Sequence, residues 1–144
     1  MRKIKKITAE SPEYESVLQL RNLVLRKPLG MNLFDENLEG DKEEHIFVML
    51  DENNEVVASV QFKILDTRKV KLRQMAVHPD FQKQGLGKSL VHFAEQQMKN
   101  SGYTQIEMHA RKYALPFYEK LGYKKEGEEF IEVGIPHYKM YKDL

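Results

Sequence analysis

The stretch that decides the fold is residues 75–88, MAVHPDFQKQGLGK. It passes from an apolar, strand-like end through a loop into a pattern of helical period that opens at Gly85-Leu86-Gly87. Glycines allow close approach to the backbone, and the free N–H groups of a first helical turn attract anions. Lys83 and Lys88 add positive charge. The segment therefore predicts a strand, an anion-binding loop and a helix, with phosphate as the obvious ligand.

Two common nucleotide-binding motifs do not fit this loop. A dinucleotide fingerprint needs a third glycine where Leu90 stands, and a P-loop needs one where Gln82 stands. Both nucleotide folds are disfavoured. On spacing alone, a simpler interpretation stays open, in which the two glycines only relieve crowding at the start of the helix.

Upstream of the loop, the pattern predicts an antiparallel meander. The three strand-like runs are 45–50, 56–65 and 70–77. Short polar turns at 51–54 and 67–69 separate them, as in β-hairpins. Before the meander we expect a first strand over 2–8 and a helix that begins with Ser11 as N-cap and Pro12 as its first residue. Pro28 and Gly30 should end that helix.

Downstream of the loop, helices and strands alternate. The expected elements are a helix from Leu86 to residue 99, a strand over 103–110, a short helix over 114–121 and strands over 123–130 and 137–141. The helical crossover predicts that strand 103–110 runs parallel to strand 70–77. The order β, α, meander, α, β, α, β, β indicates one α/β (α+β) domain over residues 1–144.

Composition excludes several classes of protein. The 144 residues are 41% hydrophobic and 31% charged, as in a globular domain, and no apolar run approaches the roughly 18 residues of a membrane span. The basic start leads into no apolar signal segment, so we expect a cytoplasmic protein. The absence of cysteine excludes disulfides, cysteine-bound metal and a thiolate nucleophile. A net charge of +1 gives no overall field for nucleic acid.

Three motifs together resemble the GNAT superfamily of acyl-CoA-dependent N-acyltransferases. QKQGLG at 82–87 resembles its pyrophosphate loop, FYEKLGY at 117–123 resembles its second signature, and GIPH at 134–137 resembles the ElaA-like branch. The similarity runs from about Arg21 to the end. It implies a single-domain GNAT-like fold with a mixed, mostly antiparallel central sheet and helices on both faces.

The resemblance also implies how the coenzyme binds. The backbone of Met75, Ala76 and Val77 would pair with the pantetheine arm like an added strand. The pyrophosphate would lie on the loop whose residues are Gln82, Lys83, Gln84, Gly85, Leu86, Gly87 and Lys88. Tyr118 would also contact the coenzyme and donate a hydrogen bond to the departing thiolate, although its position equally fits a core aromatic on a helix.

The general base is an open question at this stage. An aliphatic amine with a pKa near 10.4 costs about 4.6 kcal/mol to deprotonate at pH 7, so a base is needed. Related enzymes often carry a glutamate on the strand where this chain has Arg73. Our candidates are therefore His109, with Glu107 on the same face of its strand, then His137, then Glu132. The alternative is that each histidine only fills a half-buried strand position.

The acceptor site is expected between residues 21 and 44. Arg21 and Arg26 would suit a carboxylate or phosphate on the acceptor, whereas the acidic residues of 35–44 would attract a cation. A third interpretation makes the acidic run a solvated loop.

The sequence thus predicts an enzyme that transfers an acetyl group from acetyl-CoA to a primary amine by direct attack, without a metal. The alternatives are a non-catalytic acyl-CoA sensor of the same fold and, more remotely, a nucleic-acid-binding module using Lys3, Lys5, Lys6 and the basic residues of 69–73. We expect no membrane partner, and a homodimer stays open.

Overall fold

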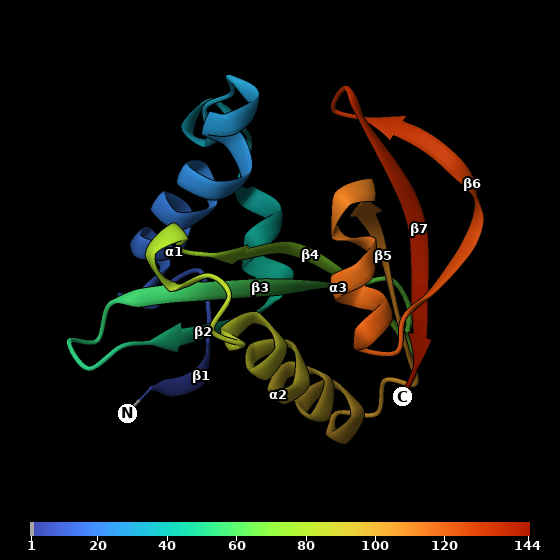
Figure 1. The fold of residues 1–144 in the computed structure, drawn as a ribbon. Coiled ribbons are helices and arrows are strands. Elements are labelled where there is room, and N and C mark those ends of the chain that lie inside the picture. Colours follow the sequence, from blue (N-terminus) through green and yellow to red (C-terminus); the bar gives the residue numbers. More distant parts are fainter. Residues whose placement is uncertain (1) are drawn as a thin grey trace.

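The computed structural model describes residues 2–144 and arranges them around one seven-stranded sheet, with strand order β1-β2-β3-β4-β5-β7-β6 (Figure 1). The strands are β1 (Lys3–Ile7), β2 (His45–Leu50), β3 (Val56–Ile64), β4 (Lys69–Val77), β5 (Gln105–Arg111), β6 (Lys124–Glu132) and β7 (Ile135–Asp143). The α-helices are α1 (Tyr14–Arg21), α2 (Leu86–Asn100) and α3 (Leu115–Lys120). β4 and β5 run parallel, and every other pair of neighbouring strands is antiparallel. The mixed α+β sheet and the parallel crossover are confirmed.

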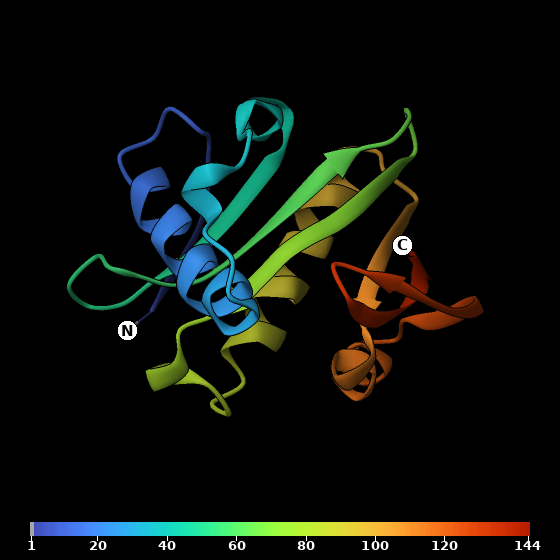
Figure 2. The ribbon, with the colours of Figure 1, turned by 90° about the horizontal axis from the view of Figure 1, so that it is seen from above.

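The sheet is buried on both faces because helices cover each side of it. Successive side chains of a strand point to opposite faces. On β2, Ile46 and Val48 share an apolar cluster with Leu20 of α1, whereas Phe47 belongs to the larger cluster that includes Leu90 of α2. Figure 2 shows α1 and α2 on opposite sides of the central strands. β2 is therefore a continuous apolar run.

The structure differs from the expected start of the first helix. α1 begins at Tyr14, and Ser11 lies in the turn before it. The Ser11 hydroxyl accepts a hydrogen bond from the Thr8 backbone N–H (2.9 Å) instead of capping the helix. After Arg21 the chain continues as a π-helical turn, Asn22–Arg26, and the helical segment ends at Gly30 (φ +71°), as expected.

β4 is the irregular strand of the sheet. Its register with β3 shifts between Ser59 and Gln61, and Gln74 lies there with φ +55°. Such a bulge bends a strand and redirects its side chains. β4 pairs with β5 only over Lys69–Lys71, and beyond that point the two strands diverge (Figure 1). Within residues 2–144, no strand pairs with the remaining β5-facing edge of β4, so backbone groups along this edge have no strand partner.

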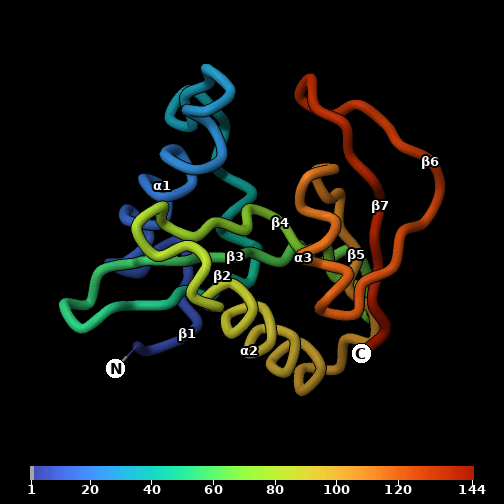
Figure 3. The backbone as a smooth tube through the Cα atoms, viewed as in Figure 1, coloured from blue at the N-terminus to red at the C-terminus, as the bar shows by residue number. Residues whose placement is uncertain are grey.

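The sheet is also distorted at its other end. β6 pairs with β7 at both of its ends, with a register shift between Glu126 and Phe130. Figure 3 shows β6 bowing away from β7 between these paired ends. The turn that follows Glu132 is thereby brought beside β5, where the candidate site lies.

The acidic stretch 35–44 is solvated in part, with Asp35, Glu39 and Glu43 exposed, but two of its acidic side chains are held against the sheet. Asp41 is 4% exposed and its carboxylate accepts hydrogen bonds from Arg21 (2.7 Å), Tyr14 (2.5 Å) and Gln61 (3.1 Å). The side chain of Glu44 is 4% exposed and forms an ion pair with Arg73 of β4. These acidic residues therefore fasten the segment to the sheet.

Replacing Arg21 with methionine should destabilise the protein by about 3–5 kcal/mol, because Asp41 would stay buried without its countercharge. Although burial alone would raise the pKa of Asp41, hydrogen bonds from Tyr14 and Arg21 hold it below its ordinary value of 3.8. The native ion pair should therefore contribute fully above about pH 4 and lose its effect at lower pH. Urea denaturation at pH 7 and pH 3 measures both effects.

Lys42 provides the matched control, because its ion pair with Glu39 is exposed. Replacing Lys42 with methionine should change the stability by less than about 0.5 kcal/mol. Equal stabilities of the two variants would contradict the importance of the buried pair.

Candidate active site

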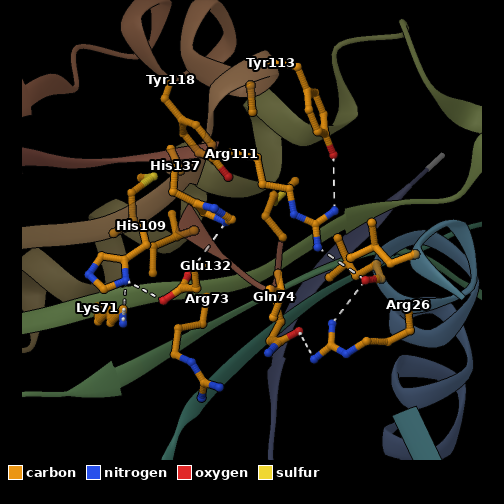
Figure 4. A pocket seen from close by; sticks show the side chains of 18 of the residues that line it. Arg26, Lys71, Arg73, Gln74, His109, Arg111, Tyr113, Tyr118, Glu132 and His137 are labelled. Carbon is orange, nitrogen blue, oxygen red and sulfur yellow. Dashed lines mark hydrogen bonds and ion pairs between the residues drawn. The ribbon is translucent and has the colours of Figure 1, made fainter. Parts of the chain in front are cut away.

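The candidate site is a cavity of about 390 Å³ beside the point where β4 and β5 diverge. Its walls come from the segment 25–36, β4, β5, α3 with the residues before it, and the turn between β6 and β7 (Figure 4). The side chains that carry chemistry are Arg26, Lys71, Arg73, His109, Arg111, Tyr113, Tyr118, Glu132 and His137. All three residues proposed from sequence as the base, and Tyr118, therefore line one cavity.

His109, Glu132 and His137 form a connected cluster, with the carboxylate between the two rings (Figure 4). The Nδ1 atom of His109 lies 3.0 Å from Oε1 of Glu132, and the Nε2 atom of His137 lies 3.7 Å from Oε2. Glu107, the partner expected for His109, instead pairs with Lys139 at 3.2 Å. The structure therefore replaces Glu107 with Glu132 as the neighbour of the imidazole.

The protonation of the His137 ring follows from its surroundings. Its Nδ1 lies 2.8 Å from the carbonyl oxygen of Ile135, which can only accept, so Nδ1 carries a hydrogen. In the neutral ring Nε2 is then an acceptor that faces a carboxylate oxygen of Glu132. Their contact is favourable when the ring is protonated or when a donor, such as an ammonium group, lies between them.

Glu132 is held as a carboxylate. Although burial works in the other direction, the hydrogen bond from His109 and the positive charges around it keep the pKa of Glu132 below its ordinary value. Burial and the charge of Arg73 in turn lower the pKa of Lys71, whose Nζ lies 3.4 Å from Nδ1 of His109. The carboxylate at the centre of the cluster therefore lies against two imidazole rings, with Lys71 beside the first of them.

Tyr118 is a core aromatic residue that also lines the cavity, so its position fits both of the interpretations made from the sequence, core packing and contact with the coenzyme. Its ring belongs to the core and packs edge-on against Phe117 and Tyr123, yet the residue lines the cavity. Burial raises the pKa of Tyr118, so the phenol stays protonated. Within residues 2–144, no group is hydrogen-bonded to its hydroxyl, which leaves the O–H available to a ligand.

The loop before α2 has the form expected of an anion site. Gly85, the N-cap, has φ +76°, a conformation that favours glycine. The side chain of Gln82 donates to the Val77 carbonyl oxygen (3.0 Å) and ties the loop to the end of β4. A Cβ on Gly87 would lie 3.1 Å from Met75 and 3.3 Å from Phe117. Gly87 thus relieves crowding, as the simpler interpretation held, and keeps open the approach between β4 and α3.

The two arginines expected to bind the acceptor have different positions. Arg21 is 2% exposed and its guanidinium is engaged by Asp41 and Gln61, so it does not reach the cavity. Arg26 does line the cavity and forms a two-point ion pair with Glu36 (2.7 and 3.2 Å). The expectation for Arg21 is therefore wrong, because the residue is part of the buried network.

Sequence reasoning missed Arg111 and Lys71 as members of the site. Arg111 lies two residues after His109, and alternation along β5 places both on the same half-buried face. That spacing was a usable signal. Lys71 could not be assigned in the same way, because its proximity to His109 depends on how β4 pairs with β5.

Comparisons with known proteins identify the family and the fold of this chain. A family model described as "Acetyltransferase (GNAT) domain" matches residues 24–144. The uncharacterized protein YyaT of Bacillus subtilis is 33% identical over 143 residues, covering 98% of this chain and 95% of that protein. The crystal structure of Escherichia coli ElaA has a TM-score of 0.84 at 19% identity and covers 99% of each chain.

A second solved structure of similar fold contains a bound ligand. A GNAT family acetyltransferase from Elizabethkingia anophelis, solved with acetyl-CoA bound, has a TM-score of 0.74 at 20% identity, covering 99% of this chain and 98% of that one. The chain described here belongs to the GNAT acetyltransferase family. Among residues 2–144, none of the helices has the length and apolar character needed to span a bilayer.

Proposed function

We propose that this protein transfers an acetyl group from acetyl-CoA to the primary amine of a small molecule or peptide, by direct attack in a ternary complex. The observation that carries the proposal is the cavity at the β4–β5 opening. The cavity holds the acid–base cluster and Tyr118, and one of its lining residues, Met75, lies against Gly87 of the loop before α2. The acetyl-CoA bound to the Elizabethkingia anophelis protein of the same fold supports the choice of donor.

The residues present fit the coenzyme. The edge of β4 at Met75, Ala76 and Val77, which pairs with no strand on the β5 side, offers backbone groups to the amides of pantetheine, although the Val77 carbonyl already accepts a hydrogen bond from Gln82. The first-turn N–H groups of α2 offer donors to a pyrophosphate, and the exposed Lys83 and Lys88 add charge beside them. Gly87 lets Met75 of β4 and Phe117 of α3 pack against the start of α2, next to both of these sites.

The cluster of His109, Glu132 and His137 can bind the ammonium group of the acceptor and remove a proton from it. Glu132 and Nε2 of His137 would hold the ammonium group between them, and the imidazole would accept one proton. The nitrogen lone pair then attacks the thioester carbonyl carbon, a C–N bond forms and the C–S bond breaks. Tyr118 donates a hydrogen bond to the departing sulfur, and the second amine proton ends on the thiol. His109 acts as a positioning residue, because it holds the Glu132 carboxylate.

One observation favours a second candidate, an acyl-CoA sensor without turnover. Arg73, paired with Glu44, occupies the strand position where the family often carries a glutamate. Incubation with acetyl-CoA and a panel of primary amines, followed by measurement of free thiol, separates the two. We expect amine-dependent thiol release in proportion to acetylated product. Micromolar binding of acetyl-CoA without thiol release from any amine would support the sensor.

Replacing Gly87 with alanine should raise the KM for acetyl-CoA about tenfold, with little change in kcat. The added Cβ would crowd Met75 and Phe117 at the proposed pantetheine passage, and overpacking of this kind costs about 1–3 kcal/mol. Gly40 is the matched control, since a Cβ there meets nothing within 4 Å and its φ is not positive. An unchanged KM in the Gly87 variant would argue against this path.

A further inference from the structure

Two guanidinium groups meet at the edge of the cavity. Nη1 of Arg26 and Nη2 of Arg111 lie 3.4 and 3.3 Å from the same atom, the carbonyl oxygen of Leu25. The two side chains come from different parts of the fold, Arg26 from the helical segment and Arg111 from β5, and Figure 4 shows both at the cavity. The structure thus gathers two positive charges around one neutral acceptor.

Only one of these charges has an anionic partner. Glu36 neutralises Arg26 through its two-point ion pair. Arg111 donates to the Tyr113 hydroxyl (3.3 Å) and the Leu25 carbonyl, and among residues 2–144 no carboxylate lies within 4.0 Å of its nitrogen atoms. A guanidinium has five N–H donors, so three remain for a ligand.

The unbalanced charge of Arg111 is a binding determinant. Half-buried like charges raise the free energy of the free protein unless an anion joins them, and a planar guanidinium matches carboxylate and phosphate oxygens in particular. Of the other cations of the cavity, Arg73 already pairs with Glu44, and Lys71 lies at the acid–base cluster beside His109, where burial lowers its pKa. An incoming anion would therefore be drawn to Arg111 rather than to its neighbours.

We propose, building on the proposed function, that the amine acceptor carries an anionic oxygen group, carboxylate or phosphate, which Arg111 binds with support from Arg26. Arg111 and His109 lie two residues apart on one face of β5, which is about 7 Å along a strand. An amine at the acid–base cluster and an anion at Arg111 therefore belong to one compact molecule, such as an amino acid or a short amino phosphate.

The test compares matched acceptors with three forms of the enzyme. The acceptors are short amino carboxylates with their carboxamides, and phosphoethanolamine with ethanolamine. The enzymes are the wild type, Arg111→Gln and Arg111→Lys. In the wild type we expect the anionic member of at least one pair to have a KM at least tenfold lower.

In the Arg111→Gln variant that KM should rise about 10- to 100-fold, since a hydrogen bond to a charged group contributes about 1.5–3 kcal/mol. The KM of the neutral acceptors and of acetyl-CoA should not change, and Arg111→Lys should restore part of the affinity. Arg68 is an exposed arginine that does not line the cavity, so Arg68→Gln controls for loss of surface charge.

Several results would overturn the inference. One is equal or better use of the neutral acceptors, which would leave the proposed function intact. Another is a rise in the KM of acetyl-CoA alone, which would assign Arg111 to the coenzyme. Calorimetric titration of the same acceptors in the presence of coenzyme A gives a readout without turnover. No binding of any anionic acceptor, or equal affinities in wild type and Arg111→Gln, would refute the proposal even if no amine were acetylated.

Discussion

Replacing His137 with asparagine should lower kcat about 10³-fold near neutral pH. Asparagine keeps a side-chain N–H for the Ile135 carbonyl, which Nδ1 of the native ring contacts at 2.8 Å, but it removes the Nε2 atom that faces Glu132. The proposed acceptor of the ammonium proton is thereby deleted, and general base catalysis contributes about 10²–10⁴-fold. The rate should be followed as amine-dependent thiol release from pH 5 to 9.

The pH profile distinguishes loss of the base from partial misfolding of the His137→Asn variant, because misfolding would lower the rate without removing one limb of the profile. In the wild type kcat/KM should fall at acid pH, because a protonated imidazole cannot accept the amine proton, and the variant should lose that limb. His109→Gln should have a smaller effect, since that ring acts through Glu132. The exposed His92 serves as control, and His92→Gln should behave as wild type. An unchanged acidic limb in both site variants would reject histidine as the base.

Replacing Tyr118 with phenylalanine should lower kcat about 10²-fold, with little change in the KM for the amine. The substitution removes only the hydroxyl that lines the cavity, and one donor aimed at developing charge contributes about 10²–10³-fold. Because burial raises the pKa of Tyr118 above its ordinary value of 10, this group should add no basic limb to the profile below pH 9. Steady-state kinetics over that range measure both effects.

The fold should survive this substitution, since the ring contacts with Phe117 and Tyr123 are kept. Tyr103→Phe is the matched control, because its hydroxyl lies 3.5 Å from His45 and outside the cavity. Full turnover by the Tyr118→Phe enzyme would limit Tyr118 to a packing role.

Much of the fold could be predicted because local chemistry specifies it. The polar turn at 51–54 places the first hairpin, and the change of period after Gly85 places the helix that makes β5 parallel to β4. The bulge at Gln74 could not be predicted, because no glycine or proline marks that positive φ. It depends on how β3 and β4 pair, which is a tertiary effect.

Individual residues of the candidate site could be predicted from the sequence, but the contacts between them could not. His109, Glu132 and His137 could each be chosen by type, yet their contact depends on the pairing of β5 with β7 and on the turn after β6. The prediction that Arg21 binds the acceptor was wrong because its residue type does not reveal its partner. A charged residue that pairs with a buried acid twenty residues away has the same sequence signature as one that faces solvent.

Direct transfer of the acetyl group is the central claim, and intact-protein mass spectrometry during the first turnovers tests it most directly. The enzyme is mixed with acetyl-CoA alone and then with an amine that supports thiol release. The account predicts that the protein mass never changes, while acetylated amine and free thiol accumulate in equal amounts after the amine is added. A protein that gains an acetyl group from acetyl-CoA and loses it to the amine at the catalytic rate would contradict it.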